Sequence, residues 1–187
     1  MRTGLRVVLT TLACLSGCSL KSSLPDMGTV PRFALTAETG EAFDSKSLLG
    51  RVWIADFIFT TCHGPCPRMT SQMRKLHTDL KDLADVSYIS FTVDPENDTP
   101  PALSAYARQF GADPERWHFL TGSKADLNRL SYDTFHLGKV GGPQIEHSGR
   151  FVLIDRKSRI RGYYDSSDPD ALKQLASDIL ALRSEVL

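Results

Sequence analysis

Hydrophobic residues recur along the chain with two different periods. Val52 to Phe59 is an almost unbroken apolar run, and Val86 to Val93 is a second. Runs of this length are typical of strands that are covered on both faces of a sheet. Between them a set of apolar side chains falls at helical spacing, namely Met69, Met73, Leu76, Leu80 and Leu83. This stripe predicts an amphipathic helix from about Pro67, with both methionines in the core rather than at a metal.

The same alternation of strand-like and helix-like segments continues on either side. Residues 33–35 and 42–43 flank Thr39-Gly40 and predict a short hairpin. The later segments predict helices at 102–110, 124–135 and 170–182, and strands at 117–120, 151–154 and 160–164. The order β, α, β, α, β, α, β, β, α indicates an α/β domain in which helices flank a central sheet.

The first twenty residues have the composition of an export signal. Arg2 and Arg6 precede an apolar run from Val7 to Leu15, and Ser16-Gly17-Cys18 follows. The run is shorter than the roughly 20 residues needed to cross a bilayer, so it predicts a signal peptide. Leu15 to Cys18 resembles the lipobox of bacterial lipoproteins, which implies cleavage before Cys18 and lipidation of Cys18. The alternative is a secreted protein in which Cys18 is free or paired, and both place the protein outside the cytoplasm.

The remaining composition predicts one domain on a tether. Small and helix-breaking residues follow Cys18, so we expect a signal peptide at 1–17, a lipid-anchored linker at 18–30 and a single domain at 31–187. Without residues 1–17 the chain has 20 basic and 22 acidic residues, a net charge of −2. Because polyanions are bound mainly by clustered Lys and Arg, and these are dispersed here, no nucleic-acid partner is expected.

Besides the lipidated Cys18, the predicted mature chain keeps two cysteines, in the pentapeptide Cys62-His63-Gly64-Pro65-Cys66 at a strand-to-helix junction. Cysteines four residues apart can face the same way on a helical turn, so both sulfurs can approach one ion. The positive end of a helix stabilises thiolates, and the thiol pKa values are therefore expected to fall. The pair can bind a soft metal, exchange disulfides or form a structural disulfide, although so short a loop gains little stability from one.

Three separate motifs resemble the Sco/SenC family, the thioredoxin-like copper chaperones of cytochrome c oxidase assembly. They are residues 60–67 (TTCHGPCP), residues 93–100 (VDPENDTP) and His147-Ser148 ahead of the strand at 151–154. The resemblance extends from about Phe33 to the last helix. It implies a thioredoxin-like fold with a central mixed sheet and an N-terminal β-hairpin extension. It also implies that Cys62, Cys66 and His147 bind copper, as Cu(I), Cu(II) or both.

The chemistry of these donors agrees with the resemblance. Thiolates favour Cu(I), and an imidazole adds a nitrogen that Cu(II) accepts. Without the resemblance, a surface or hydrogen-bonded histidine is the favoured interpretation of His147, ahead of a metal ligand. His63 and Asp94 are candidates for groups beside the ligands, while capping of the next helix by Asp98 or Thr99 is the main alternative for the acidic segment. His63 and Gly64 also depart from the proline and acidic residue that many family members have.

We therefore predict a periplasmic or otherwise extracytoplasmic lipoprotein that carries copper and is not primarily an enzyme. Its expected partners are the copper-binding subunit of a cytochrome c oxidase, a thiol reductant or another copper chaperone, and the membrane that holds the lipid. The alternative is a thiol–disulfide oxidoreductase, in which one of Cys62 and Cys66 attacks a substrate disulfide and the other resolves the mixed disulfide. Peroxide reduction by a single thiolate is a third option.

Overall fold

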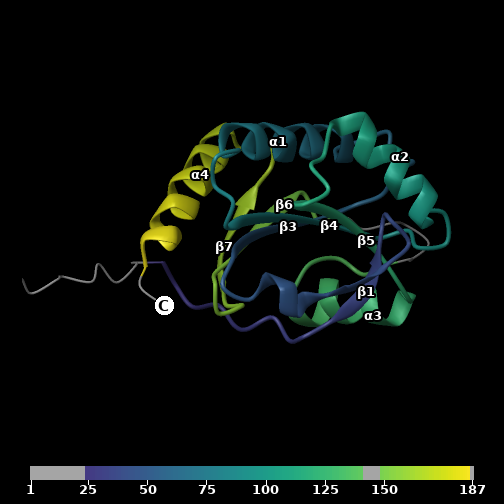
Figure 1. Ribbon diagram of the computed structural model, residues 1–187, viewed down its shortest axis with the longest axis horizontal. Helices are drawn as coiled ribbons and strands as arrows, with labels where there is room; N and C mark the ends of the chain where they lie inside the picture. The colour runs from purple at the N-terminus through teal and green to yellow at the C-terminus, as the bar shows by residue number, and fades with distance from the viewer. Residues whose placement is uncertain (1–23, 141–147, 186–187) are drawn as a thin grey trace, which may run out of the picture.

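A mixed sheet forms the centre of the protein (Figure 1). The computed structural model describes residues 24–140 and 148–185, and in these residues seven strands lie in the order β2-β1-β5-β4-β3-β6-β7. The strands are β1 (Ala34–Ala37), β2 (Ala42–Asp44), β3 (Val52–Ile58), β4 (Val86–Thr92), β5 (Trp117–Thr121), β6 (Arg150–Ile154) and β7 (Ile160–Asp165). The helical segments are η1 (Ser45–Leu48), α1 (Cys66–Asp79), α2 (Pro100–Phe110), α3 (Lys124–Asn128), η2 (Arg129–Thr134) and α4 (Pro169–Ser184).

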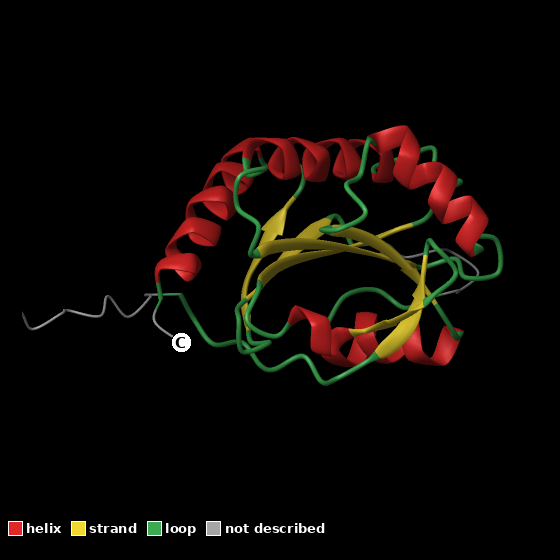
Figure 2. Cartoon of the chain, in the orientation of Figure 1, coloured by secondary structure: helices red, strands yellow, loops and turns green. Residues whose placement is uncertain are grey.

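The pairing of the strands confirms the predicted thioredoxin-like arrangement. β3, β4 and β5 are parallel, while β6 runs antiparallel to β3 and pairs with β7. β1 and β2 form the expected N-terminal hairpin, which extends the sheet because β1 also pairs with β5. Helices α1, α2 and α4 cover one face, and α3, η1 and η2 lie on the other (Figure 2).

The two apolar runs are buried on both faces, as their composition predicts. Every residue of β3 and β4 is buried. Trp53 and Phe57 pack on the face that carries α3 and η2, and Ile54 and Ile58 pack beneath the other three helices. Met69 and Met73 are fully buried in that second cluster, together with Leu76. The interpretation of the methionine stripe as core is confirmed.

The helix predicted at 124–135 differs in form. It divides into a short α-helix, α3, and a wider helical segment, η2. The widening is visible in the hydrogen bond from Phe135 N to Leu130 O at 2.8 Å, which spans five residues instead of four. It brings the fully buried Phe135 ring against Trp53 and Phe57. The spacing of apolar residues alone does not predict such a change of helical pitch.

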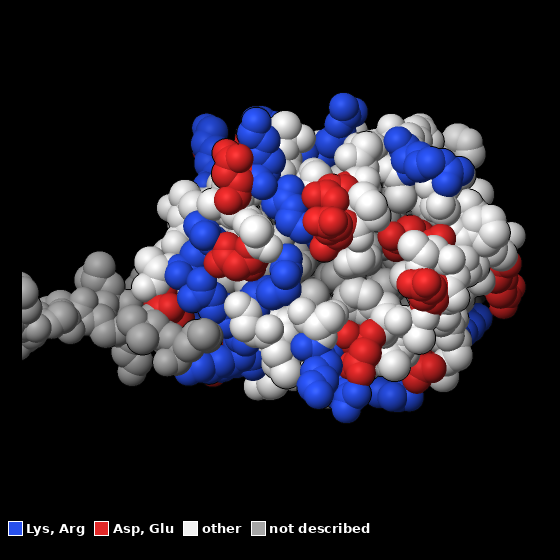
Figure 3. All heavy atoms as spheres, viewed as in Figure 1, with Lys and Arg blue, Asp and Glu red and all other residues white. Residues whose placement is uncertain are grey.

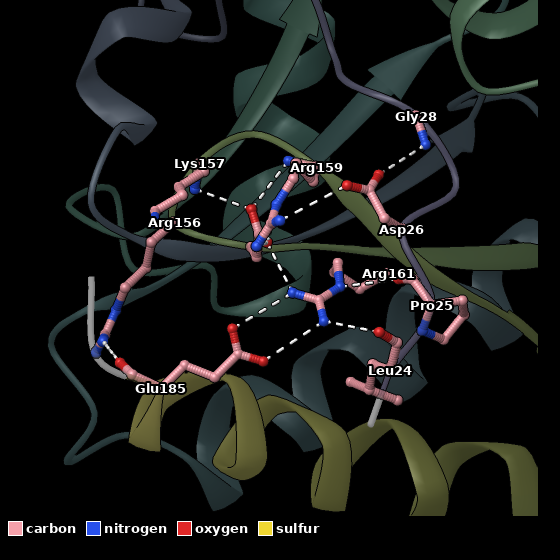
Figure 4. Close-up of polar contacts among 10 residues, drawn as sticks. Leu24, Pro25, Asp26, Gly28, Arg156, Lys157, Arg159, Arg161 and Glu185 are labelled. Atoms are coloured by element: carbon pink, nitrogen blue, oxygen red, sulfur yellow. Dashed lines mark hydrogen bonds and ion pairs between the residues drawn. The ribbon is translucent and has the colours of Figure 1, made fainter. Parts of the chain in front are cut away.

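The N-terminal segment is held against the domain by a buried ion pair (Figure 4). Arg161 donates to the carbonyl oxygens of Leu24 and Pro25, both at 2.8 Å, and to Asp155 Oδ2 at 2.8 Å. Main-chain bonds from Met27 N to Ile160 O and from Val30 N to Ser158 O continue the attachment. Residues 24–30, which belong to the segment predicted as a linker, therefore lie on the domain.

The predicted signal peptide and the lipidation site Cys18 lie outside the described residues. In the part of the chain that is described, no helix is long and apolar enough to cross a bilayer. On the face shown in Figure 3, acidic side chains lie among basic ones, in keeping with the balanced composition.

Candidate metal centre

The two cysteines of the pentapeptide lie next to each other at the carboxyl end of β3. β3 ends at Ile58, a loop follows, and α1 begins at Cys66 with Pro65 at its N-cap. Cys66 is fully buried and Cys62 is 8% exposed, and both are free thiols. The thiol of Cys66 is hydrogen bonded to that of Cys62, and Gly64 N lies 3.4 Å from Cys62 Sγ as its donor. The structure thus brings together the two sulfurs that the sequence singled out.

The environment of Cys66 works against ionisation. Burial raises the pKa of the Cys66 thiol above its usual range, and the hydrogen bond to Cys62 and the charge of Asp56 act in the same direction. The expectation of a lowered pKa is therefore wrong for Cys66, because the loss of hydration exceeds the stabilisation that a helix N-terminus provides. In the metal-free protein this sulfur is held as a neutral thiol.

A buried carboxyl group near Cys66 was not anticipated from the sequence. Asp56 lies in the middle of β3, fully buried, and among the described residues neither of its carboxyl oxygens meets hydrogen-bond geometry. Burial raises the pKa of Asp56 to about 7, and Ser90, its partner in β4, opposes this only in part. An acidic residue inside an apolar run was the one signal available, since a buried charge without a partner is costly.

The side chain of Thr70 stabilises the first turn of α1. Thr70 Oγ1 donates to the carbonyl oxygen of Cys66 at 3.0 Å and lies 3.0 Å from the hydroxyl of Tyr106 in α2. Burial raises the pKa of Tyr106 to about 12, so this hydroxyl stays protonated and can donate. The contact joins α1 to α2 directly below Cys66.

Asp98 joins the cysteine loop to the neighbouring strand. Its buried carboxylate accepts hydrogen bonds from the backbone N–H of Thr60, 3.2 Å from each oxygen, and from the hydroxyls of Thr60 and Thr92. The expected N-cap position is confirmed for Thr99, although its side chain makes no capping bond, and it is wrong for Asp98, which accepts from Thr60 instead. Sequence spacing missed this contact because Thr60 and Asp98 are 38 residues apart.

The other predicted site residues are less closely connected to the thiols. Asp94 accepts from Asn97 Nδ2 at 2.9 Å, and its N–H donates to Thr92 Oγ1, so the bonds described for it stay near its own loop. His63 is exposed beside Cys62. His147 lies outside the described residues. Within residues 24–140 and 148–185, no group of three or more His, Cys, Asp or Glu side chains is arranged around one ion.

The two adjacent thiols nevertheless suit a soft metal ion. The two thiols interact with each other, so the two sulfurs are close enough to approach one ion. Cysteine thiolates select soft ions such as Cu(I), and binding to them displaces the thiol protons. Two protein ligands leave at least one coordination position to be filled by another group.

Comparison with known proteins identifies similar sequences. A family model described as SCO1/SenC matches residues 22–182. The SCO1 protein homolog of Bacillus subtilis is 34% identical over 155 residues, covering 80% of each chain. A Stutzerimonas stutzeri protein, named as copper-binding, is 30% identical over 148 residues, which are 75% of this chain and 71% of that one.

Solved structures with the same fold include three that are informative. A SCO1/SenC family lipoprotein from Bacillus anthracis is 35% identical with a TM-score of 0.75, over 83% of this chain and 95% of that one. BsSco, described as a Sco family cytochrome c oxidase assembly protein with a disulfide switch, is 32% identical with a TM-score of 0.75, over 85% and 96%. ScoI of Bradyrhizobium japonicum, solved with copper bound, is 25% identical with a TM-score of 0.67, over 83% and 99%.

Proposed function

This chain belongs to the SCO1/SenC family, and we propose that it binds copper through Cys62, Cys66 and His147 and delivers it to the copper centre of a cytochrome c oxidase. The observation that carries the proposal is the pair of free, adjacent thiols at the start of α1. A copper-binding relative and a relative with copper bound in its structure support the choice of metal.

The topology of the sheet supports His147 as the third ligand. β6 begins at Arg150, three residues after His147, and runs antiparallel to β3. The start of β6 therefore lies at the same end of the sheet as the end of β3, where the cysteine loop begins. A ligand supplied from just before β6 has a short path to both sulfurs.

The buried setting defines what the residues contribute. Cys66 is held neutral until the metal replaces its proton, so metal binding releases protons and strengthens as the pH rises. Gly64 N–H donates to Cys62 Sγ and orients it. Cys62 is the less buried of the two cysteines, at 8% exposed against 0% for Cys66, so copper can be handed to a partner by stepwise exchange of ligands that starts at the Cys62 sulfur.

The cellular setting follows the same reasoning. We propose a lipoprotein held by Cys18 on the outer side of a cytoplasmic membrane or in the periplasm, a location that the lipoprotein from Bacillus anthracis supports. The proposed recipient is the copper-binding subunit of the oxidase, since BsSco is described as an oxidase assembly protein. A thiol reductant would return the two cysteines to the dithiol, and another copper chaperone would supply the copper.

A second function, thiol–disulfide exchange, is favoured by the same pair of sulfurs. Two free thiols at hydrogen-bonding distance can close to a disulfide, and a disulfide switch is described for BsSco. In this alternative the protein reduces cysteines of an oxidase subunit or of another exported protein. His147 would then have no essential part in the chemistry.

A competition titration with Cu(I) tests the proposal. The reduced protein is titrated without oxygen against a chromogenic Cu(I) chelator, with His147→Ala and Cys62→Ser beside the wild type and His136→Ala as a matched control. We expect one tightly bound Cu(I) that is weakened in both site variants and unchanged in the control. A wild type that fails to compete with the chelator would refute copper binding and favour disulfide exchange, and an unchanged affinity in His147→Ala would remove that ligand.

A further inference from the structure

We propose that the contact between Asp98 and Thr60 biases Cys62 and Cys66 toward the dithiol and against the disulfide. The inference rests on the proposed function, because the dithiol is the form that can bind the metal. Asp98 is thus a positioning residue, which acts on the sulfurs through the loop.

The contact has the features of a rigid attachment. Asp98 is fully buried, and three donors converge on its carboxylate, namely the N–H and the hydroxyl of Thr60 and the hydroxyl of Thr92. Thr92 is the last residue of β4, and Thr60 precedes Cys62 by two positions. The carboxylate therefore ties the beginning of the cysteine loop to the carboxyl end of β4, the central strand of the sheet. Hydrogen bonds to an ionised acceptor are stronger than neutral ones.

The two sulfurs must move closer before they can form a bond. They are now free thiols in a hydrogen bond, whereas a disulfide needs an S–S distance of about 2.0 Å and Cβ atoms about 3.8 Å apart. At least one of the two residues has to shift, and the structure shows which one is easier to move.

Cys66 is the more deeply buried of the pair. It begins α1, is fully buried in the core between α1 and the sheet, and its carbonyl oxygen accepts a hydrogen bond from Thr70 Oγ1. Closure of the disulfide therefore falls on Cys62 and its loop. The bonds from Thr60 to Asp98 hold that loop in the arrangement seen here, so they stabilise the dithiol relative to the disulfide.

The equilibrium that reports this bias can be written in full. The protein dithiol and glutathione disulfide give the protein disulfide and two molecules of glutathione. The two cysteines lose two protons and two electrons, and the glutathione disulfide takes up both. The equilibrium constant, measured in glutathione buffers by trapping free thiols and weighing the protein, compares the stability of the two protein forms directly.

The variants remove the contact from each side. Asp98→Asn replaces an acceptor oxygen with a donor, and Thr60→Val removes the hydroxyl and keeps the size of the side chain. We expect each to shift the equilibrium toward the disulfide, Asp98→Asn by about fivefold or more and Thr60→Val by less, because its backbone N–H still bonds Asp98. The shift of the equilibrium constant in the double variant should be smaller than the product of the two single shifts. Glu96→Gln, which alters an exposed carboxylate in the same loop, is the control and should leave the constant unchanged.

Two results would overturn the inference. One is an unchanged constant in both Asp98→Asn and Thr60→Val, and the other is a shift toward the dithiol. Unfolding of the reduced protein is measured in parallel, so that a general loss of stability is distinguished from a shift in the redox equilibrium. If Asp98→Asn does not fold, Thr60→Val still tests the inference. Failure of the wild type to bind Cu(I) would refute the proposed function separately, since the glutathione equilibrium involves no metal.

Discussion

Arg161 and Asp155 form an ion pair at 2.8 Å in which both side chains are only 5% exposed. Arg161, at the beginning of β7, also donates to the carbonyl oxygens of Leu24 and Pro25. At the same end of the sheet, Gly50 N in the loop before β3 donates to Arg156 O. The cysteine loop leaves β3 at its other end. The described chain thus begins at the end of the sheet opposite the thiols, an arrangement that would leave them accessible to a partner if the chain before Leu24 is tethered to a membrane.

Arg161→Met should lower the free energy of unfolding by about 3 kcal/mol or more. The change leaves Asp155 buried with less compensation, and it removes the donor for two carbonyl oxygens. Urea denaturation at neutral pH measures the difference. Arg129→Met, which breaks the exposed pair with Asp126, is the control and should change stability little. Equal effects of the two variants would show that burial of the Arg161 pair has no special weight.

Asp56 predicts a pH dependence of opposite sign to that of a salt-bridged carboxylate. Burial raises the pKa of Asp56 to about 7 in the folded state, so the folded protein binds this proton more tightly than the unfolded chain does. Its contribution to stability is present below about pH 4 and is lost as the pH rises to about 7. In the wild type the free energy of unfolding should therefore fall by at most about 4 kcal/mol between about pH 4 and about pH 7, and in Asp56→Asn this fall should be absent.

The measurement for Asp56 is urea denaturation of the metal-free, reduced protein at several pH values between 4 and 8. The comparison needed is the slope of stability against pH, since the buried amide of the variant changes the absolute value as well. Asp133→Asn, at an exposed position in η2, is the matched control and should keep the wild-type slope. The same slope in Asp56→Asn as in the wild type would contradict the prediction.

Thr70 predicts an energetic coupling between α1 and α2. Thr70→Val removes the hydroxyl that bonds Cys66 O and Tyr106 OH, so the Tyr106 hydroxyl loses its described partner. We expect a loss of about 1–2 kcal/mol, and a smaller loss when Thr70→Val is made in a Tyr106→Phe background. A double-mutant cycle by chemical denaturation gives the coupling. Strictly additive effects would mean that the 3.0 Å contact contributes nothing to stability.

The sequence allowed the architecture to be predicted because periodicity reports burial. The continuous runs at β3 and β4 and the stripe through Met69 and Met73 each correspond to buried surfaces in the structure. The contacts around the thiols were harder to predict. The role of Asp98 depends on a bond across 38 residues, and the raised pKa of Cys66 depends on how many groups cover it. Both are consequences of packing, which the spacing of residues along one segment does not encode.

The difference in environment between the two thiols predicts a difference in their reactivity. Cys66 is fully buried with a raised pKa, whereas Cys62 keeps 8% of its surface exposed. Because the thiolate is the form that reacts, iodoacetamide at neutral pH should label Cys62 at least about ten times faster than Cys66 in the reduced, metal-free protein. Peptide mass spectrometry over time measures both rates, and urea should make them similar by exposing both side chains. Faster labelling of Cys66 in the folded protein would show that the helix N-terminus outweighs burial there, and that Cys66 rather than Cys62 is the first sulfur a partner meets.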